Sequence, residues 1–322
     1  MRIVFLGNFA NYWNSESYYA LTLESLGHEV RRFHDDAVST LELQQAARDC
    51  HLFIWLHWPG TPCGENPSVP EILDDVRERG VPVVAYHSDL FHGLPRGAVL
   101  KQDQAYRSLT HFFGADPETA AWFEREEGTV GRHLSSGVFL GDCEMLPRTV
   151  VDGGGWARDV VFVGCRAYHE EWPYRPQLID WLSETYGDRF THVGHDGTGL
   201  RYGQELNQLL ADAKVVVGDS LCLGYDSPGY WSDRVYELIG RGAFLIHPHV
   251  PGLERHFRDG EHLRFYEYGN FAQLRSLIDE FLENDEERET IRRAGFEHVR
   301  EHHTYTNRWT EMLRVMFGDD DA

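Results

Sequence analysis

The chain has 322 residues, of which 42% are hydrophobic, and its 52 acidic residues against 30 Lys and Arg give a net charge of -22. This composition excludes a disordered chain, because the apolar side chains can offset the entropy lost on folding, and it suits one large or two medium domains. The negative charge disfavours nucleic acid as a partner without excluding it, and no apolar run approaches the roughly 18 residues of a membrane segment, so we expect a cytoplasmic protein.

Short apolar runs bounded by turn residues alternate with segments of helical periodicity, a pattern typical of strand-helix units in a parallel sheet. In the first half the expected strands are Arg2–Leu6, Glu29–Phe33, Leu52–Leu56, Val81–Tyr86 and Thr110–Phe113. Helices are expected between them. Ser15–Leu26 is one, because its apolar residues recur every three or four positions and Gly27 follows as a stop.

Between Gly141 and Trp156 the periodicity lapses, and Pro147 with three consecutive glycines indicates a linker. The strands expected after it are Val160–Val163, Thr191–Val193, Val215–Val217 and Phe244–His247. One helix is expected to begin near Pro173. The other expected helices are Glu205–Ala211, Asp233–Arg241, Phe271–Glu283, Glu286–Val299 and Tyr305–Phe317. We therefore predict an α/β protein with doubly wound domains at 1–145 and 146–302 that face a central cleft. A last helix within 303–322 is expected to pack back on the N-terminal domain.

The glycine pattern excludes one common nucleotide-binding loop and disfavours another. A Gly-Lys-Ser/Thr phosphate loop is excluded, because the only lysines, Lys101 and Lys214, follow Leu100 and Ala213. The first strand is followed by Gly7 and then Asn-Phe-Ala-Asn, which is not the G-x-G-x-x-G of a dinucleotide site. Gly7 itself either lets a ligand approach the end of the strand closely or forms a plain turn.

The segment from Ser232 to Ile246 has the order of a helix cap, a helix, a glycine stop and a buried strand. Arg234, Glu237 and Arg241 fall on one face of this helix. Periodicity alone leaves two interpretations open, an exposed ladder of charges and a binding surface.

This stretch resembles the C-terminal half of group-one glycosyltransferases, in particular the branch similar to the CgeB spore-maturation protein. The residues that carry the resemblance are Ser232, Arg234, Tyr236, Glu237, Gly240 and Gly242. The similarity extends over about Val160–Leu313 and is only architectural before that. It implies the GT-B fold, in which two Rossmann-like domains flank a cleft, and a glycosyltransferase whose co-substrate is a nucleoside-diphosphate sugar. No further cofactor is implied, and the nucleotide cannot be identified.

The resemblance also implies residue roles. Glu237 is expected to accept hydrogen bonds from the ribose hydroxyls of the donor, which suits a carboxylate, and Arg234 to face the diphosphate one turn earlier. The loop with Gly164 and Arg166 resembles the family's donor loop, and Arg175 is a second candidate cation. The remaining expected donor-binding residues are Gly7, Ser232 and Tyr236.

In the N-terminal half an apolar strand ends in His87, Ser88 and Asp89. This resembles the His-Asp that follows a strand in many retaining GT-B enzymes, where the histidine lies near the transferred sugar. The alternative is a turn in which the polar side chains bind backbone N–H groups. If the anomeric configuration is inverted, His87 or Asp89 is the candidate general base, and if it is retained the leaving phosphate can deprotonate the acceptor.

One departure from the family concerns its usual pair of glutamates eight positions apart, because Gly229 stands eight residues before Glu237. Asp219, Asp226 and Ser227 are candidates for the missing contacts to the sugar, and the departure leaves retention or inversion open. A nucleotide-sugar epimerase of GT-B fold and a non-catalytic sugar-nucleotide-binding protein remain as alternatives.

Metal chemistry is not expected. There is no H-E-x-x-H and no Asp-x-Asp at the end of a strand, and the five cysteines are scattered without a C-x-x-C pair. The resemblance implies a metal-independent, retaining transferase. Its acceptor, a glycan, a metabolite, a protein or a modified DNA base, cannot be read from the sequence, and neither can the oligomeric state.

Overall fold

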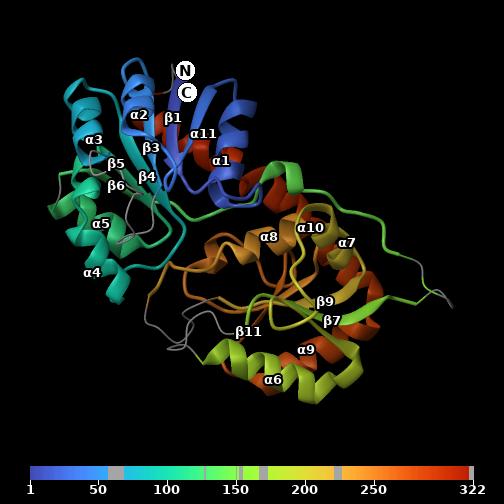
Figure 1. The fold of residues 1–322 in the computed structure, drawn as a ribbon. Helices are drawn as coiled ribbons and strands as arrows, with labels where there is room; N and C mark the ends of the chain where they lie inside the picture. The colour runs from blue at the N-terminus through green and yellow to red at the C-terminus, as the bar shows by residue number, and fades with distance from the viewer. Residues whose placement is uncertain are drawn as a thin grey trace. The chain divides into compact units, whose positions relative to one another are not determined.

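The structure is a computed structural model, and it describes residues 1–56, 69–126, 128–149, 151, 155–166, 173–220 and 227–318. The chain divides into two compact units, Met1–Ser136 with Tyr305–Ala322 and Gly137–Thr304. Each unit contains a parallel sheet with helices packed on it (Figure 1). The expected α/β fold with two Rossmann-like domains is confirmed.

In the first unit the described strands form a parallel sheet of order β2-β1-β3-β4-β5-β6. They are β1 (Arg2–Gly7), β2 (Glu29–His34), β3 (Leu52–Trp55), β4 (Val83–His87), β5 (His111–Gly114) and β6 (Val130–His133). In the centre of the sheet, Ile3 of β1 lies beside Val30 of β2 and Leu52 of β3. All residues of β3 and β4 are buried, as expected for parallel strands covered on both faces.

The helices of this unit are α1 (Ser15–Ser25), α2 (Thr40–Ala47), α3 (Val69–Glu78), α4 (Pro95–Gln102), α5 (Pro117–Glu126) and α11 (Tyr305–Phe317). The last of these, although far away in sequence, packs beside α1 (Figure 1). Trp309 is fully buried, and its ring centroid lies 5.9 Å from that of Tyr19 in α1 and 6.4 Å from that of Tyr86 in β4. An aromatic cluster therefore fastens α11 to the sheet.

The second unit has a parallel sheet of order β11-β10-β9-β7-β8 in its described part. Its strands are β7 (Arg158–Val163), β8 (Phe190–Val193), β9 (Ala213–Val217), β10 (Leu245–Pro248) and β11 (Arg264–Tyr266). Its helices are α6 (Tyr174–Tyr186), α7 (Gly203–Ala211), α8 (Arg234–Gly240), α9 (Phe271–Glu283) and α10 (Asp285–His302). One apolar core lies under α6 and α9 and a second lies under α7, α8 and α10, so both faces of the sheet are covered (Figure 1).

Two short edge strands, β6 and β11, were not expected from the sequence. β6 has exposed residues at its end, and a Cβ atom at Gly131 would lie 2.0 Å from the carbonyl oxygen of Ala120, so glycine allows α5 to approach the strand. β11 has three residues and only one of them is buried. Neither strand forms the apolar run that indicates a central strand. Among the described helices, none combines the length and the apolar character needed to cross a membrane.

Candidate active site

The first element of the site is the turn after β7. Gly164 has a φ of 154°, and a Cβ atom there would lie 3.2 Å from the ring of Phe162 and 3.5 Å from Nη1 of Arg175. Its N–H donates to the carbonyl oxygen of Val193 over 2.8 Å, which ties the turn to β8. Both the backbone conformation and the crowding favour glycine, and the turn brings Cys165 to the carboxyl edge of the sheet.

Arg175 of α6 forms a buried ion pair with Asp219, which follows β9. Nε donates to Oδ2 over 2.7 Å and Nη2 donates to Oδ1 over 3.1 Å, while Nη1 donates to the carbonyl oxygen of Cys165 over 3.1 Å. The side chains of Arg175 and Asp219 are only 10% and 2% exposed. Arg175 therefore joins the loops after β7 and β9, and its charge is balanced inside the unit.

Arg166 lies nearer the surface and is bound to the same helix. Its two terminal nitrogens each donate to a carboxylate oxygen of Asp180 over 2.5 Å, and its backbone N–H donates to Asp196 over 3.1 Å. The hydrogen bonds to Asp180 raise the pKa of Arg166, although the guanidinium is 35% exposed. The structure thus pairs both candidate cations of the β7 loop with carboxylates of their own unit.

Arg234 and Glu237 lie together on α8. Nη1 of Arg234 is 3.3 Å from Oε2 of Glu237, and the side chains are 34% and 22% exposed. Burial alone would lower the pKa of Arg234, but the carboxylates of Glu237, Asp233 and Asp219 raise it above its ordinary value. The guanidinium is therefore a cation close to the end of β9 that solvent, and hence a ligand, can still reach.

Ser232 connects this helix to the loop after β9. Its N–H donates to Oγ of Ser220 over 2.8 Å, and its own Oγ accepts from the N–H of Arg234 over 3.3 Å. The residues gathered at the carboxyl ends of β7 and β9, hereafter the donor cluster, are Cys165, Asp219, Ser220, Ser232, Arg234 and Glu237. In open α/β sheets ligands bind at this edge.

Other residues of the same motif pack inside the unit. Tyr236 is fully buried, and its hydroxyl accepts from Nε1 of Trp231 over 2.8 Å. A Cβ atom at Gly240 would lie 2.8 Å from Cγ1 of Val138, and Gly242 has a φ of 84°. These positions serve the packing of α8, so the motif combines a buried framework with two reachable side chains.

Arg241 separates from the other charges of α8. Its side chain is 4% exposed, Nη1 donates to Oδ1 of Asn207 over 2.7 Å, and Nη2 donates to Asp142. It therefore fixes residues that precede β7 onto α7 and α8. The three charged residues expected on one helix face therefore have different environments: Arg241 is buried, whereas Arg234 and Glu237 are partly exposed.

Gly229 occupies the position of the missing first glutamate. It has a φ of 89°, and its N–H donates to the carbonyl oxygen of Pro251 over 3.0 Å. A glutamate would be strained in this left-handed conformation. Of the candidate replacements, Asp219 is bound to Arg175, Asp226 lies outside the described residues, and Oγ of Ser227 is enclosed without a hydrogen-bond partner within the described part of the chain.

In the first unit, His87 ends β4 and turns into the core. It is 6% exposed, Nε2 lies 2.6 Å from the hydroxyl of Tyr106, and the ring stacks on Phe112 with centroids 5.8 Å apart. Asp89 is only partly buried. Of the two expected catalytic residues, Asp89 is the more accessible, whereas one ring nitrogen of His87 already has a partner.

Glu16, which the sequence analysis did not single out, lies beside Asp89. Its Cγ would be 3.0 Å from a Cβ atom at Gly7, so glycine at the end of β1 makes room for it. The pKa of Glu16 is raised to about 7, chiefly by burial, while the backbone N–H groups of Glu16 and Asn8 lower it and the charges of Asp35 and Asp89 add to the rise. The sequence signal was only a glutamate in the first turn of a helix, which usually complements the helix dipole.

One group of side chains in the described part of the chain has donor atoms close enough to hold a metal ion, namely His34, Asp35 and Asp36 at the end of β2. Asp36 is exposed, and Nδ1 of His34 already lies 3.1 Å from Oδ1 of Asp35. Exposed acidic groups of this kind are common in proteins without an ion, so we assign no metal there.

Two parallel-sheet Rossmann-like domains are the architecture of the GT-B fold. The model of the family described as glycosyl transferase-like matches residues 170–314, which include α8 and the strands beside it. Residues 170–314 are thus similar to a glycosyltransferase domain. No curated protein matches it in sequence.

Solved structures with the same fold cover nearly the whole chain. Anabaena HepE in complex with UDP and glucose has a TM-score of 0.66 at 14% identity, covering 98% of this chain and 100% of HepE. An alpha-glucosyltransferase in complex with UDP-glucose and DNA containing an abasic site has a TM-score of 0.68 at 12% identity, and the match covers 98% of this chain and 99% of that enzyme. Sucrose-phosphate synthase from Thermosynechococcus elongatus has a TM-score of 0.61 at 12% identity, and the match covers 98% of this chain and 99% of the synthase. The fold of this chain is therefore the GT-B fold.

Proposed function

We propose that the protein transfers a sugar from a UDP-sugar to an acceptor hydroxyl or amine and belongs to the branch similar to CgeB. The observation that carries this proposal is the Arg234–Glu237 pair, which lies within the matched domain at the carboxyl edge of the second sheet. UDP is favoured as the nucleotide because HepE and the alpha-glucosyltransferase are bound to UDP or UDP-glucose in their structures.

The donor is held by opposite charges with distinct tasks. The Glu237 carboxylate accepts hydrogen bonds from both hydroxyls of the ribose, and the Arg234 guanidinium faces the diphosphate. At 3.3 Å and partly exposed, their ion pair is weak enough to open when the donor binds. As the bond to the sugar breaks, negative charge grows on the diphosphate, and Arg234 stabilises it without requiring a metal ion.

The stereochemistry we propose is retention, as the resemblance implies. An oxygen of the leaving phosphate then takes the proton of the acceptor on the same face of the sugar. Gly229 has no side chain to support this geometry, so the contact to the sugar falls to another residue between β9 and α8. In an inverting reaction, Asp89 or Glu16 would instead act as the general base.

The acceptor side is assigned to the carboxyl edge of the first sheet, where Asp89 and Glu16 lie close to one another. Some proteins of similar fold, such as the alpha-glucosyltransferase, have structures that contain DNA. The net charge of -22 disfavours DNA as an acceptor here. A glycan, a small metabolite or a protein is therefore preferred.

The test is calorimetric titration with UDP, GDP, ADP and UDP-glucose. Glu237→Ala should weaken UDP binding by roughly 1.5 to 3 kcal/mol, about 10- to 150-fold, because charged hydrogen bonds to the ribose are lost. Glu280→Ala is the matched control, since it removes an exposed glutamate from α9 of the same unit. Equal affinities of the two variants would remove Glu237 from the donor site.

A second candidate function is binding without transfer, and Gly229 is the observation that favours it. One measurement distinguishes binding alone from transfer: the rate at which UDP is released from UDP-glucose. Slow release that a mixture of glycans accelerates supports a transferase. Binding with no release, or release of an epimerised sugar without an acceptor, identifies one of the two alternatives.

A further inference from the structure

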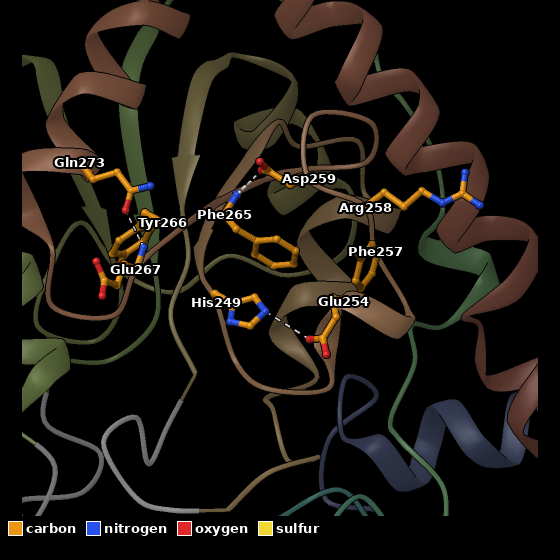
Figure 2. Close-up of a pocket in the computed structure, with 9 residues that line it drawn as sticks. All are labelled: His249, Glu254, Phe257, Arg258, Asp259, Phe265, Tyr266, Glu267 and Gln273. Carbon is orange, nitrogen blue, oxygen red and sulfur yellow. Dashed lines mark hydrogen bonds and ion pairs between the residues drawn. The ribbon is translucent and has the colours of Figure 1, made fainter.

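A pocket lies in the second unit, beyond the ends of β10 and β11 (Figure 2). Its volume is about 630 Å³, within the usual range for ligand sites. His249 directly follows β10 and Glu267 directly follows β11, so the pocket occupies the carboxyl edge of the sheet at its β11 side. It shares no residue with the donor cluster in the described part of the chain.

The middle of the pocket is aromatic. In Figure 2 the ring of Phe257 lies to one side of the Phe265 ring, and the ring of His249 lies below it. The ring of His249 meets that of Phe265 edge to face, with centroids 5.4 Å apart. Phe257 is buried, whereas Phe265 is only partly buried, so an apolar ring is offered to a ligand. Such a surface can cover the C–H face of another ring.

Hydrogen-bond acceptors surround this aromatic floor. They are the carboxylates of Glu254, Asp259 and Glu267. Asp259 already accepts from the N–H of Phe265 over 2.7 Å, which fixes the carboxylate beside the ring. Oε2 of Glu254 accepts from the N–H of Gly252 over 2.8 Å and leaves the other oxygen for a ligand.

Hydrogen-bond donors lie among the acceptors. Nε2 of His249 is 3.2 Å from Oε2 of Glu254, whereas the guanidinium of Arg258 points away from Phe265 in Figure 2 and is paired with Glu261. Oε1 of Gln273 accepts from the N–H of Glu267 over 2.7 Å, so the amide nitrogen of Gln273 remains as a donor. Donors and acceptors are thus interleaved around one apolar ring.

This mixture selects a neutral ligand. An anion would meet three carboxylates, and a cation would find Asp259 already paired with Arg264 and Glu254 already bound to His249. A hydroxyl group both donates and accepts, so a ring with several hydroxyls can satisfy both kinds of partner while its C–H face covers Phe265. We infer that this pocket is a carbohydrate-binding site for a neutral sugar of one or two rings, separate from the donor site. The inference concerns binding alone and does not depend on the proposed transfer.

The experiment is saturation-transfer difference NMR on the full chain with maltose, cellobiose and lactose as probes, in the absence of nucleotide. At least one disaccharide should receive saturation in the unmodified protein. Phe265→Leu, which keeps apolar packing but removes the ring, and Glu254→Ala should each lower the signal by about fivefold or more. Glu280→Gln, on the exposed face of α9, is the control and should leave the signal unchanged.

Two charged probes, spermidine and glucose 6-phosphate, test the class of ligand. No saturation of any disaccharide, or a signal that survives both Phe265→Leu and Glu254→Ala in folded protein, overturns the inference. Binding of a charged probe in place of the neutral sugars overturns it as well. Melting temperatures of the variants establish that they are folded, and calorimetry with UDP separates this result from the proposed function, since UDP binding should persist in both pocket variants.

Discussion

Glu16 carries its proton to an unusually high pH, because burial raises its pKa from 4.5 to about 7. The folded protein therefore holds a proton that the unfolded chain releases near pH 4.5. Stability falls as pH rises from about 4.5 to about 7, and the penalty is fully present above pH 7. Removing this carboxyl group should therefore stabilise the protein only at higher pH.

The variant that tests this is Glu16→Gln. Its melting temperature at pH 8 should exceed that of the unmodified protein by on the order of 5 °C, and the difference should nearly vanish at pH 4.5. Glu29→Gln, on the exposed start of β2, is the control and should show no such pH dependence. A Glu16→Gln shift that is the same at both pH values would mean that Glu16 is not desolvated.

The two arginines near the β7 turn should differ in their effect on stability. Arg175→Ala leaves the carboxylate of Asp219, 2% exposed, without its counter-ion, and should cost about 3 to 5 kcal/mol. Arg166→Ala removes an exposed pair and should cost about 1 kcal/mol or less. Urea unfolding of the two variants makes the comparison, and similar losses would show that the buried pair is not essential. A combined Arg175→Met and Asp219→Asn variant should recover much of the loss.

At the scale of elements, α11 contributes to the first unit chiefly through Trp309, which contacts Tyr19 and Tyr86. Trp309→Ala should destabilise the protein by about 3 to 5 kcal/mol, because the cavity cannot close fully among aromatic rings. Phe317→Ala, at the less buried end of the same helix, should cost clearly less. Urea unfolding followed by circular dichroism measures both. Equal losses would mean that α11 is held by its whole length and not by this cluster.

The central strands were predictable from the sequence because parallel strands buried on both faces are continuous apolar runs, as in β3 and β7. The edge strands β6 and β11 are short and partly exposed, so the same signal is missing there. The spacing in the sequence placed Arg234 and Glu237 on one face of a helix, and the family resemblance, not the spacing, gave them roles in donor binding. The sequence could not indicate Glu16, since its environment is created by segments that come together only in the fold.

At the scale of the whole molecule, the composition excluded a disordered chain and the charge disfavoured a nucleic-acid partner, but neither identified a function. The division into two sheets was visible in the alternation of strands and helices, and the family resemblance added the donor-binding roles. What stayed hidden were pairings between distant residues, such as Arg175 with Asp219 and His87 with Tyr106. These pairings decide which of the chemically suitable side chains are reachable by a ligand.

The first unit is built from both ends of the chain, since Tyr305 onward joins Met1–Ser136. During synthesis, the ribosome releases the sheet of this unit long before it releases Trp309, so Tyr19 and Tyr86 have no covering helix until α11 has emerged. The second unit, continuous from Gly137 to Thr304, has all its segments earlier and can fold as a block. We therefore expect the second unit to complete its fold before the first, although the first begins the chain.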